Sequence, residues 1–247
     1  MGKGKKVKKA YKRKILINLS ILIIILGIVA GIGLKSSYFL IQKVEVTNNK
    51  IVTKEEIEIL SKLKGKNIFL LNKENTINNI KTNPYIESVE IKRNFPSKVS
   101  VKVNEKKIGA FIKLNEGYVN IDDEGKMVQI VSESLEGKVP ILKNIPINKY
   151  TPNEYVYNKV EQQEALKACL KLLDLKECHG VFKELDISDP YNIKLTSSTE
   201  VEFNVGSKVN IDYKISYALS ILNSNDIKNQ KGYVKVLDDG TATFKKY

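Results

Sequence analysis

An uninterrupted apolar run dominates the hydropathy pattern near the start of the chain. Residues 15–34 (ILINLSILIIILGIVAGIGL) carry no charged side chain, and Asn18 and Ser20 are their clearly polar members. As an α-helix this run is about 30 Å long, which matches the hydrocarbon core of a bilayer. In lipid a lone segment satisfies its backbone hydrogen bonds only as a helix. The pattern therefore predicts a transmembrane helix over residues 15–34.

After residue 38 the apolar positions change period, which is typical of a mixed α and β domain. The segment FLIQKVEVTNN alternates and predicts a short strand. Thr53 and Glu56 form a capping-box pattern at the start of an amphipathic helix, and Gly65 is expected to close it. A second short helix, over about residues 72–82, is expected to bury Ile77 and Ile80 and to stop before Pro84, which lacks the N–H that a helix needs.

Two alternating segments complete this first domain. Val89 and Ile91 alternate with Glu90 and Lys92 before the turn RNFPS, and residues 98–104 alternate in the same way after it. In the second segment Val99, Val101 and Val103 share one face. The order strand–helix–helix–strand–strand predicts a compact α+β unit of about 70 residues, near the small end of domain sizes.

The remainder of the chain predicts a strand-rich second domain with flanking helices. Short apolar runs are separated by turn sequences such as LNEG and DDEG. Residues 158–175 predict a helix with Leu166, Cys169, Leu170 and Leu173 in one apolar stripe. Residues 210–225 predict another, and the chain ends in a hairpin that turns at Asp238-Asp239-Gly240. The fold class expected is α+β: a tail over 1–14, the membrane helix, and domains over 39–108 and 109–247.

The net charge of +13 resembles that of a nucleic-acid binder, but its distribution argues otherwise. Residues 1–14 contain eight Lys or Arg and no acid, so the rest of the chain has 33 basic and 28 acidic residues. Such a block is usually disordered in isolation. The positive-inside rule places it in the cytoplasm and everything from Lys35 onward outside. A cleaved signal peptide is the alternative, but its apolar region would be shorter, about 7–15 residues.

The stretch Lys92–Lys107 carries a local excess of basic residues. Because they alternate with the valines, an outer face of a strand explains most of them without any ligand. A binding site for an anionic wall polymer is the alternative, and it would use this set: Lys92, Arg93, Lys98, Lys102, Lys106 and Lys107.

The sequence offers little for catalysis or metal binding. His179 is the single histidine of the chain, which excludes a two-histidine zinc site. There is no G-x-S-x-G elbow or phosphate-binding glycine loop. The stretch NIDDEG is a weak match to a calcium loop, since Val131 stands where the bidentate Glu should be, and a hairpin turn explains it better. Cys169 and Cys178 are too few for a disulfide framework, and we expect Cys169 to be core. We therefore expect no cofactor, metal, nucleic acid or small-molecule substrate.

The order of these elements resembles the POTRA domain of the FtsQ/DivIB bacterial cell-division family. In that family a strand ends in an Arg-x-aromatic-Pro turn and leads into an alternating strand capped by Glu. The following hairpin of the family is similar to Ile121–Gly125, with Glu124 also at a matching position. The matching motif residues are Arg93, Phe95, Pro96, Glu105, Asp122 and Gly125.

The resemblance implies a bitopic divisome scaffold without enzymatic activity, concentrated at the division septum. It implies FtsL-type and FtsB/DivIC-type single-span partners and, through them, an influence on septal peptidoglycan synthases. The family's main interface maps to the C-terminal sheet region, where the last strand could lie at a sheet edge and accept a partner strand. The candidate contacts are Tyr233, Val234, Thr241, Ala242, Thr243, Phe244, Lys245 and Tyr247.

Alternatives to this interpretation remain open. Tyr233 and Phe244 could instead be a cross-strand pair that holds the hairpin together. Replacing Thr243 with Pro would test the edge strand, provided that the N–H of Thr243 points outward. A membrane-anchored wall enzyme would require a pocket that holds ionisable groups with shifted pKa values. POTRA-like units also occur in outer-membrane assembly proteins, but those carry a β-barrel that this chain is too short to include.

Overall fold

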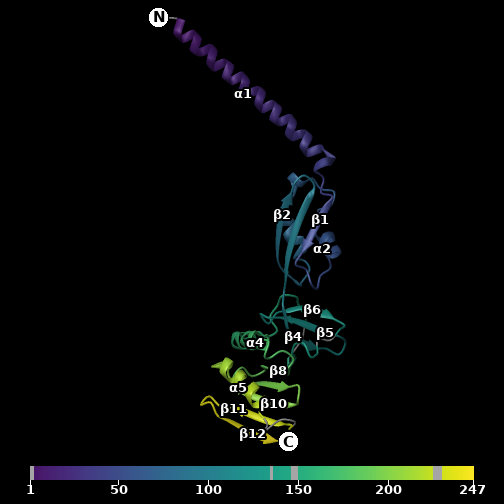
Figure 1. Ribbon diagram of the computed structural model, residues 1–247, viewed down its shortest axis with the longest axis vertical. Helices are drawn as coiled ribbons and strands as arrows, with labels where there is room; N and C mark the ends of the chain where they lie inside the picture. Colours follow the sequence, from purple (N-terminus) through teal and green to yellow (C-terminus); the bar gives the residue numbers. More distant parts are fainter. Residues whose placement is uncertain (1–2, 134–135, 146–149, 225–229) are drawn as a thin grey trace. The chain divides into compact units, whose positions relative to one another are not determined.

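The computed structural model describes residues 3–133, 136–145, 150–224 and 230–247 (Figure 1). The chain divides into two units, Met1–Glu105 and Lys106–Tyr247. The first begins with α1 (Lys3–Lys35), so the basic tail from Lys3 onward continues the apolar helix. Within α1, Leu16–Gly33 has a mean hydropathy of 2.6, and this stretch is long and apolar enough to cross a membrane.

The rest of the first unit has the order predicted from the sequence. Its three-stranded sheet has the order β1-β3-β2, with β1 parallel and β2 antiparallel to β3. This confirms the β-α-α-β-β arrangement of a POTRA-like domain. Its elements are η1 (Ser37–Phe39), β1 (Lys43–Thr47), α2 (Lys54–Ser61), η2 (Ile68–Leu70), α3 (Lys73–Ile80), β2 (Ile86–Asn94) and β3 (Lys98–Glu105).

The alternation of β3 separates core from solvent as expected. Val99, Val101 and Val103 are fully buried, while Lys98 and Lys102 are exposed. The basic side chains of this strand are therefore its solvent face, because neighbouring residues of a strand point to opposite faces.

The helix boundaries differ from the prediction. α2 ends at Ser61, because Lys62 adopts a left-handed conformation (φ 51°) and takes the capping role expected of Gly65. Half of the capping box forms: the Thr53 hydroxyl oxygen accepts from the Glu56 N–H at 3.2 Å. The Glu56 carboxylate instead accepts from the Asn83 side chain at 2.7 Å, because a tertiary partner lies within reach.

On α3 the buried positions also differ from the prediction. Thr76 and Ile80 are buried, whereas Ile77 is half-buried. Thr76 tolerates burial because its hydroxyl donates to the Asn72 carbonyl at 2.9 Å.

The described part of the second unit contains a mixed sheet of nine strands, in the order β12-β11-β10-β9-β8-β7-β4-β5-β6. Three neighbouring pairs are parallel: β4 with β7, β7 with β8, and β10 with β11. The elements are β4 (Ile108–Lys113), β5 (Tyr118–Asp122), β6 (Met127–Val131), β7 (Ile141–Lys143), α4 (Val160–Leu173), β8 (Phe182–Asp186), β9 (Ile193–Ser197), β10 (Val201–Gly206), α5 (Ile211–Asn223), β11 (Gly232–Val236) and β12 (Ala242–Lys246).

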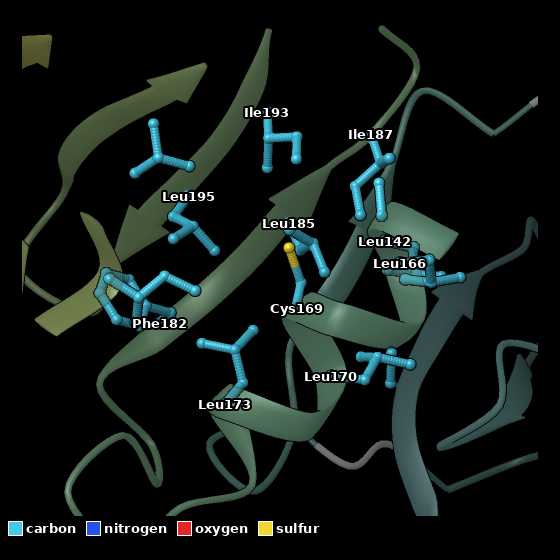
Figure 2. Packing of buried hydrophobic residues seen from close by; sticks show 14 of the residues in the cluster. Leu142, Leu166, Cys169, Leu170, Leu173, Phe182, Leu185, Ile187, Ile193 and Leu195 are labelled. Carbon is cyan, nitrogen blue, oxygen red and sulfur yellow. The ribbon is translucent and has the colours of Figure 1, made fainter. Parts of the chain in front are cut away.

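One continuous core joins the helices to the sheet. The predicted stripe of α4 is buried and faces side chains of β8 and β9, among them Leu185 and Leu195 (Figure 2). Cys169 lies in the middle of this stripe as an ordinary core residue. α5 forms the crossover between the parallel strands β10 and β11, a connection that such a pair requires.

Candidate functional site

The strand β12 lies at one end of the order of the described strands. Figure 1 shows β11 and β12, in yellow, beyond β10 and beside α5. The candidate contact residues from the sequence all lie in these two strands, or directly after β12 and in the turn that joins them. The structure therefore gathers the predicted residues into one hairpin, whose outer strand has no neighbour beyond it within the described sheet.

The hydrogen bonds of this hairpin show which backbone groups are free to pair. Tyr247 N–H donates to the Lys231 carbonyl at 3.2 Å, and Leu237 N–H donates to the Thr241 carbonyl at 2.9 Å. Hydrogen-bonded pairs alternate along an antiparallel ladder, and the register continues without a bulge. Thr243 and Lys245 therefore turn their N–H and C=O groups toward β11.

It follows that the outward groups belong to the residues in between: Ala242, Phe244 and Lys246. The test with Thr243→Pro required that the N–H of Thr243 point outward. This condition is not met, because that N–H points toward β11 within the hairpin. A proline there would disrupt β12 and would not report on the edge.

The side chains of the hairpin lie on two faces. Phe244 stands opposite Val234, and Tyr233 stands opposite Lys245. Tyr233 and Phe244 therefore cannot form the cross-strand pair considered from the sequence, because adjacent positions point to opposite faces. Phe244 covers Gly232, where an added Cβ atom would lie only 2.5 Å from the ring. The Tyr233 hydroxyl accepts from the Asn204 side chain at 2.9 Å.

The turn of the hairpin is ordered by its own acids. The Thr241 N–H and hydroxyl both donate to one carboxylate oxygen of Asp239, at 2.9 and 2.7 Å. These two hydrogen bonds, with the hydroxyl first, hold the pKa of Asp239 below its ordinary value. Gly240 follows with φ 85°, a conformation that favours glycine. The predicted Asp-Asp-Gly turn is confirmed.

A buried lysine ties this turn to α5. The Lys214 side chain is 1% exposed, and its ammonium lies 2.6 Å from a carboxylate oxygen of Asp238. Lys214 was not among the residues predicted from the sequence, although its position three residues after Ile211 places it on the apolar stripe of the helix. A charged residue within an apolar stripe was the feature of the sequence that could have indicated a buried ion pair.

The edge presents a basic surface. Lys235, Lys245 and Lys246 are exposed on the hairpin. Lys231 is instead paired with Glu200, and this contact holds the pKa of Glu200 below its ordinary value. A strand that pairs with β12 would therefore be favoured by acidic side chains near these lysines.

Three motif residues of the first unit, Arg93, Pro96 and Glu105, serve the fold. Both carboxylate oxygens of Glu105 accept from the backbone N–H groups of Lys50, Ile51 and Val52, at 2.8–3.1 Å. The Arg93 guanidinium donates to the Leu71 carbonyl at 2.7 Å. Pro96 follows a cis peptide bond in the turn between β2 and β3. These contacts explain three motif residues without any partner.

Asp122 and Gly125 also have local roles. One carboxylate oxygen of Asp122 accepts from the N–H groups of Glu124 and Lys126, at 3.1 and 2.8 Å, and Gly125 has φ 84°. The stretch NIDDEG is therefore the turn between β5 and β6, as expected. In the part of the chain that the structure describes, no group of three or more His, Cys, Asp or Glu side chains is placed to hold a metal ion.

A pocket beside the end of α4 bears on the interpretation as a wall enzyme. A small pocket there is lined by Asp174, Cys178 and His179 among others. Burial, and to a lesser degree Glu177, raises the pKa of the Cys178 thiol, which opposes formation of a nucleophilic thiolate. The Asp174 carboxylate is paired with Lys107 and lies 3.6 Å from His179. This arrangement does not activate a nucleophile.

Three of the six basic residues considered for binding a wall polymer have partners within the chain. Arg93 is engaged with the Leu71 carbonyl. Lys106 lies 3.6 Å from Asp122, and Lys107 is paired with Asp174. The exposed remainder is Lys92, Lys98 and Lys102.

Comparisons with known proteins agree with this architecture. The family described as "POTRA domain, FtsQ-type" matches residues 39–106. A "Cell division protein DivIB" from Clostridium botulinum (strain Loch Maree / Type A3) is 30% identical over 97% of this chain and 94% of its own length. A "Cell division protein FtsQ" from Syntrophotalea carbinolica is 27% identical over 62% of this chain and 53% of its own length.

A solved structure was also found. It is the major extracytoplasmic domain of the trans isomer of DivIB from Geobacillus stearothermophilus, which is 12% identical. The match covers 51% of this chain and 98% of that one, with a TM-score of 0.33, a value too low to support a conclusion about the fold.

Proposed function

The chain belongs to the DivIB/FtsQ family of cell-division proteins, and from this premise we propose that it is a membrane-anchored scaffold that binds other division proteins through β12. In this proposal residues 1–14 lie in the cytoplasm and residues 15–34 cross the membrane. Domains over 39–108 and 109–247 lie outside. The protein acts by binding and not by catalysis, and it is concentrated at the division septum.

The partners proposed are FtsL-type and FtsB/DivIC-type single-span proteins, and through them the septal peptidoglycan synthases. Such partners would reach the hairpin with an extracytoplasmic segment. Because β12 is an edge strand, that segment can add as a further strand by main-chain hydrogen bonding, while side chains supply specificity.

The observation that carries this proposal is the exposed edge of β12. Its outward N–H and C=O groups at Ala242, Phe244 and Lys246 match the spacing of an incoming strand. Phe244 is 39% exposed and offers an apolar contact on one face, while Lys245 offers a positive charge on the other. The partner strand should therefore alternate an apolar side chain, next to Phe244, with an acidic one, next to Lys245.

Proline at an outward position tests the edge directly. Ala242→Pro and Lys246→Pro each remove an outward donor, and proline is tolerated on an edge strand when its missing N–H faces solvent. We expect each substitution to weaken partner binding about 5- to 30-fold. This corresponds to a loss of roughly 1–2 kcal/mol of binding free energy, from one lost hydrogen bond and from the proline ring that pushes the partner strand away. Binding is measured by titrating the purified full-length protein with an FtsB/DivIC-type partner.

Matched controls separate binding from folding. Ala242→Ser keeps the N–H and should bind as the unchanged protein does. Lys246→Gln keeps the N–H but loses the charge, and it should bind more tightly than Lys246→Pro. Thr243→Pro should lower thermal stability, because it removes a donor within the hairpin. Unchanged affinity in both outward proline variants, with the fold intact, would show that the partner does not pair with β12.

A further inference from the structure

An exposed group of aromatic side chains lies at one end of the first unit. Tyr38, Phe69, Leu70 and Phe95 are 64%, 46%, 68% and 58% exposed. With the half-buried Phe39, the rings form a chain: the centroids of Tyr38 and Phe39 are 5.2 Å apart, those of Phe39 and Phe69 5.0 Å, and those of Phe69 and Phe95 5.3 Å. We call these five residues the aromatic patch. The exposed surface of the aromatic patch belongs neither to the hydrophobic core nor to the proposed binding edge at β12.

The patch is built on an ordered scaffold. It combines η1, η2 and the turn between β2 and β3. Ile41 N–H donates to the Lys66 carbonyl and Gln42 N–H donates to the Ser97 carbonyl, both at 2.9 Å. These bonds fix the three segments to one another, so the patch is presented as one surface.

The chain keeps this end close to the apolar helix. Tyr38 follows Gly33, the last residue of the most apolar stretch, by five residues, which span at most about 17 Å even when extended. The Asn67 side chain, in the same loop as Phe69, donates to the Gly33 carbonyl at 3.1 Å. If α1 crosses a membrane, the aromatic patch lies within reach of the lipid surface.

The three segments that carry the patch contain charge of one sign. The segments 35–43, 64–71 and 92–98, which together form this end, contain seven Lys or Arg and no Asp or Glu. Lys43 and Lys64 pair with Glu45 and Glu58, which lie outside these segments. The side chains that remain exposed here include Lys66, Lys92 and Lys98.

From these observations we infer that the aromatic patch docks into the outer surface of the bilayer, with anionic lipid headgroups held by the surrounding lysines. Aromatic side chains favour the interface between water and hydrocarbon, and lysines near a membrane attract anionic lipid. Docking would fix the height and tilt of the first unit on the membrane. It also gives Phe95 a role that the fold does not require, in contrast to its motif neighbour Arg93.

The chain contains no tryptophan, so a single introduced one reports its own surroundings. Phe95→Trp is the reporter in the full-length protein reconstituted into phosphatidylglycerol-containing vesicles with brominated acyl chains. A docked ring should lie about 5–10 Å deep at the headgroup boundary. We expect blue-shifted emission and strong quenching by the brominated lipid. Tyr38→Trp is a second reporter that should behave in the same way.

Ile51→Trp is the matched control in the same unit. Ile51 is 51% exposed, and its N–H binds Glu105 at the far end of β3. From Lys98, beside the patch, to Glu105 the strand spans roughly 23 Å. This tryptophan should be quenched weakly, about as in vesicles without bromine.

Three results would overturn the inference. One is quenching of Phe95→Trp and Tyr38→Trp no stronger than that of Ile51→Trp. Another is quenching that grows with the ratio of protein to lipid, which would assign the patch to contact between copies of the chain. The third is quenching that stays unchanged in two separate experiments. In one, Lys66, Lys92 and Lys98 are all replaced with Gln, and in the other, neutral lipid replaces phosphatidylglycerol. Weaker quenching in that lysine variant, at constant secondary structure, would support the role of the charges.

Discussion

Several acidic side chains in this protein organise the backbone around them. Glu105 accepts from three consecutive N–H groups of the loop after β1. In two hairpin turns, Asp122 accepts from two N–H groups, and Asp239 accepts from one N–H and one hydroxyl. Carboxylates suit this task because an ionised acceptor binds N–H groups more strongly than a neutral one. Asp122, part of the stretch that resembles a calcium loop in the sequence, thus orders a turn of the sheet.

Glu105→Ala tests this role in the first unit. The substitution leaves the N–H groups of Lys50, Ile51 and Val52 hydrogen-bonded to water alone. We expect the free energy of unfolding to fall by about 1.5 kcal/mol, the lower end of the range for a hydrogen bond to a charged group. Hydrogen exchange of these three amides should accelerate, while amides of β12 stay protected as before. Unchanged exchange in this loop would refute the assignment.

Cys169 provides a test with pH. Burial raises the pKa of its thiol to about 12, so the thiol should resist a disulfide reagent at pH 8 until the protein unfolds in urea. The ordinary pKa is about 8.5, so the unfolded chain releases this proton first. Its contribution to the free energy of unfolding is therefore complete below about pH 8.5 and declines as the pH rises toward the folded pKa. Rapid labelling of Cys169 in the folded protein would contradict its burial.

At the scale of elements, α5 positions the hairpin that carries the candidate site. It lies in the connection between the parallel strands β10 and β11. Its first turns supply Lys214 to Asp238, and the Tyr213 hydroxyl would lie 3.0 Å from a Cβ atom added at Gly240. The start of α5 therefore packs against the turn between β11 and β12. This contact helps to position the edge strand β12.

The contact between Lys214 and Asp238 is asymmetric, which gives a sharp prediction. Asp238→Asn leaves a buried ammonium without its carboxylate and should lower the free energy of unfolding by about 1.5–3 kcal/mol. Lys214→Met removes the buried charge and should cost less. The double variant should be more stable than Asp238→Asn alone, as measured by urea unfolding. If Asp238→Asn proves neutral, the pair does not hold the turn.

At the scale of the whole molecule, a basic helical tail and an apolar helix precede two folded units. The 33 residues of α1 join both parts in one helix, although their side chains differ in kind. Because the basic residues precede the apolar stretch, the orientation rule predicts that the part of the first unit after α1 and the whole second unit lie outside the cytoplasm. The partners and the aromatic patch proposed above require this orientation.

Protease treatment of intact protoplasts tests the orientation. A C-terminal tag on the full-length protein should be lost, while an N-terminal tag stays protected on a small fragment until the membrane is lysed. The reverse pattern, or protection of both tags, would be incompatible with the proposed scaffold. Lysed protoplasts, in which both tags are accessible, provide the control.

Local patterns in the sequence predicted most elements of this fold. Alternation identified β2 and β3, and the stripe Leu166–Leu173 identified the buried side of α4, because burial of one face imposes its period on the residues. The family resemblance then identified the POTRA-like order. Helix ends were less predictable: Lys62 replaced Gly65, and Asn83 drew Glu56 away from its cap.

The sequence by itself determined the apolar helix, the order of the elements and the position of the last hairpin. These depend on composition and on neighbours a few residues apart. Only the tertiary structure decided that β12 is the outer strand, that Thr243 turns its N–H inward, and that Lys214 is buried against the turn. Strand order, ladder phase and long-range ion pairs depend on segments far apart in the chain, and a local pattern does not encode which of them meet.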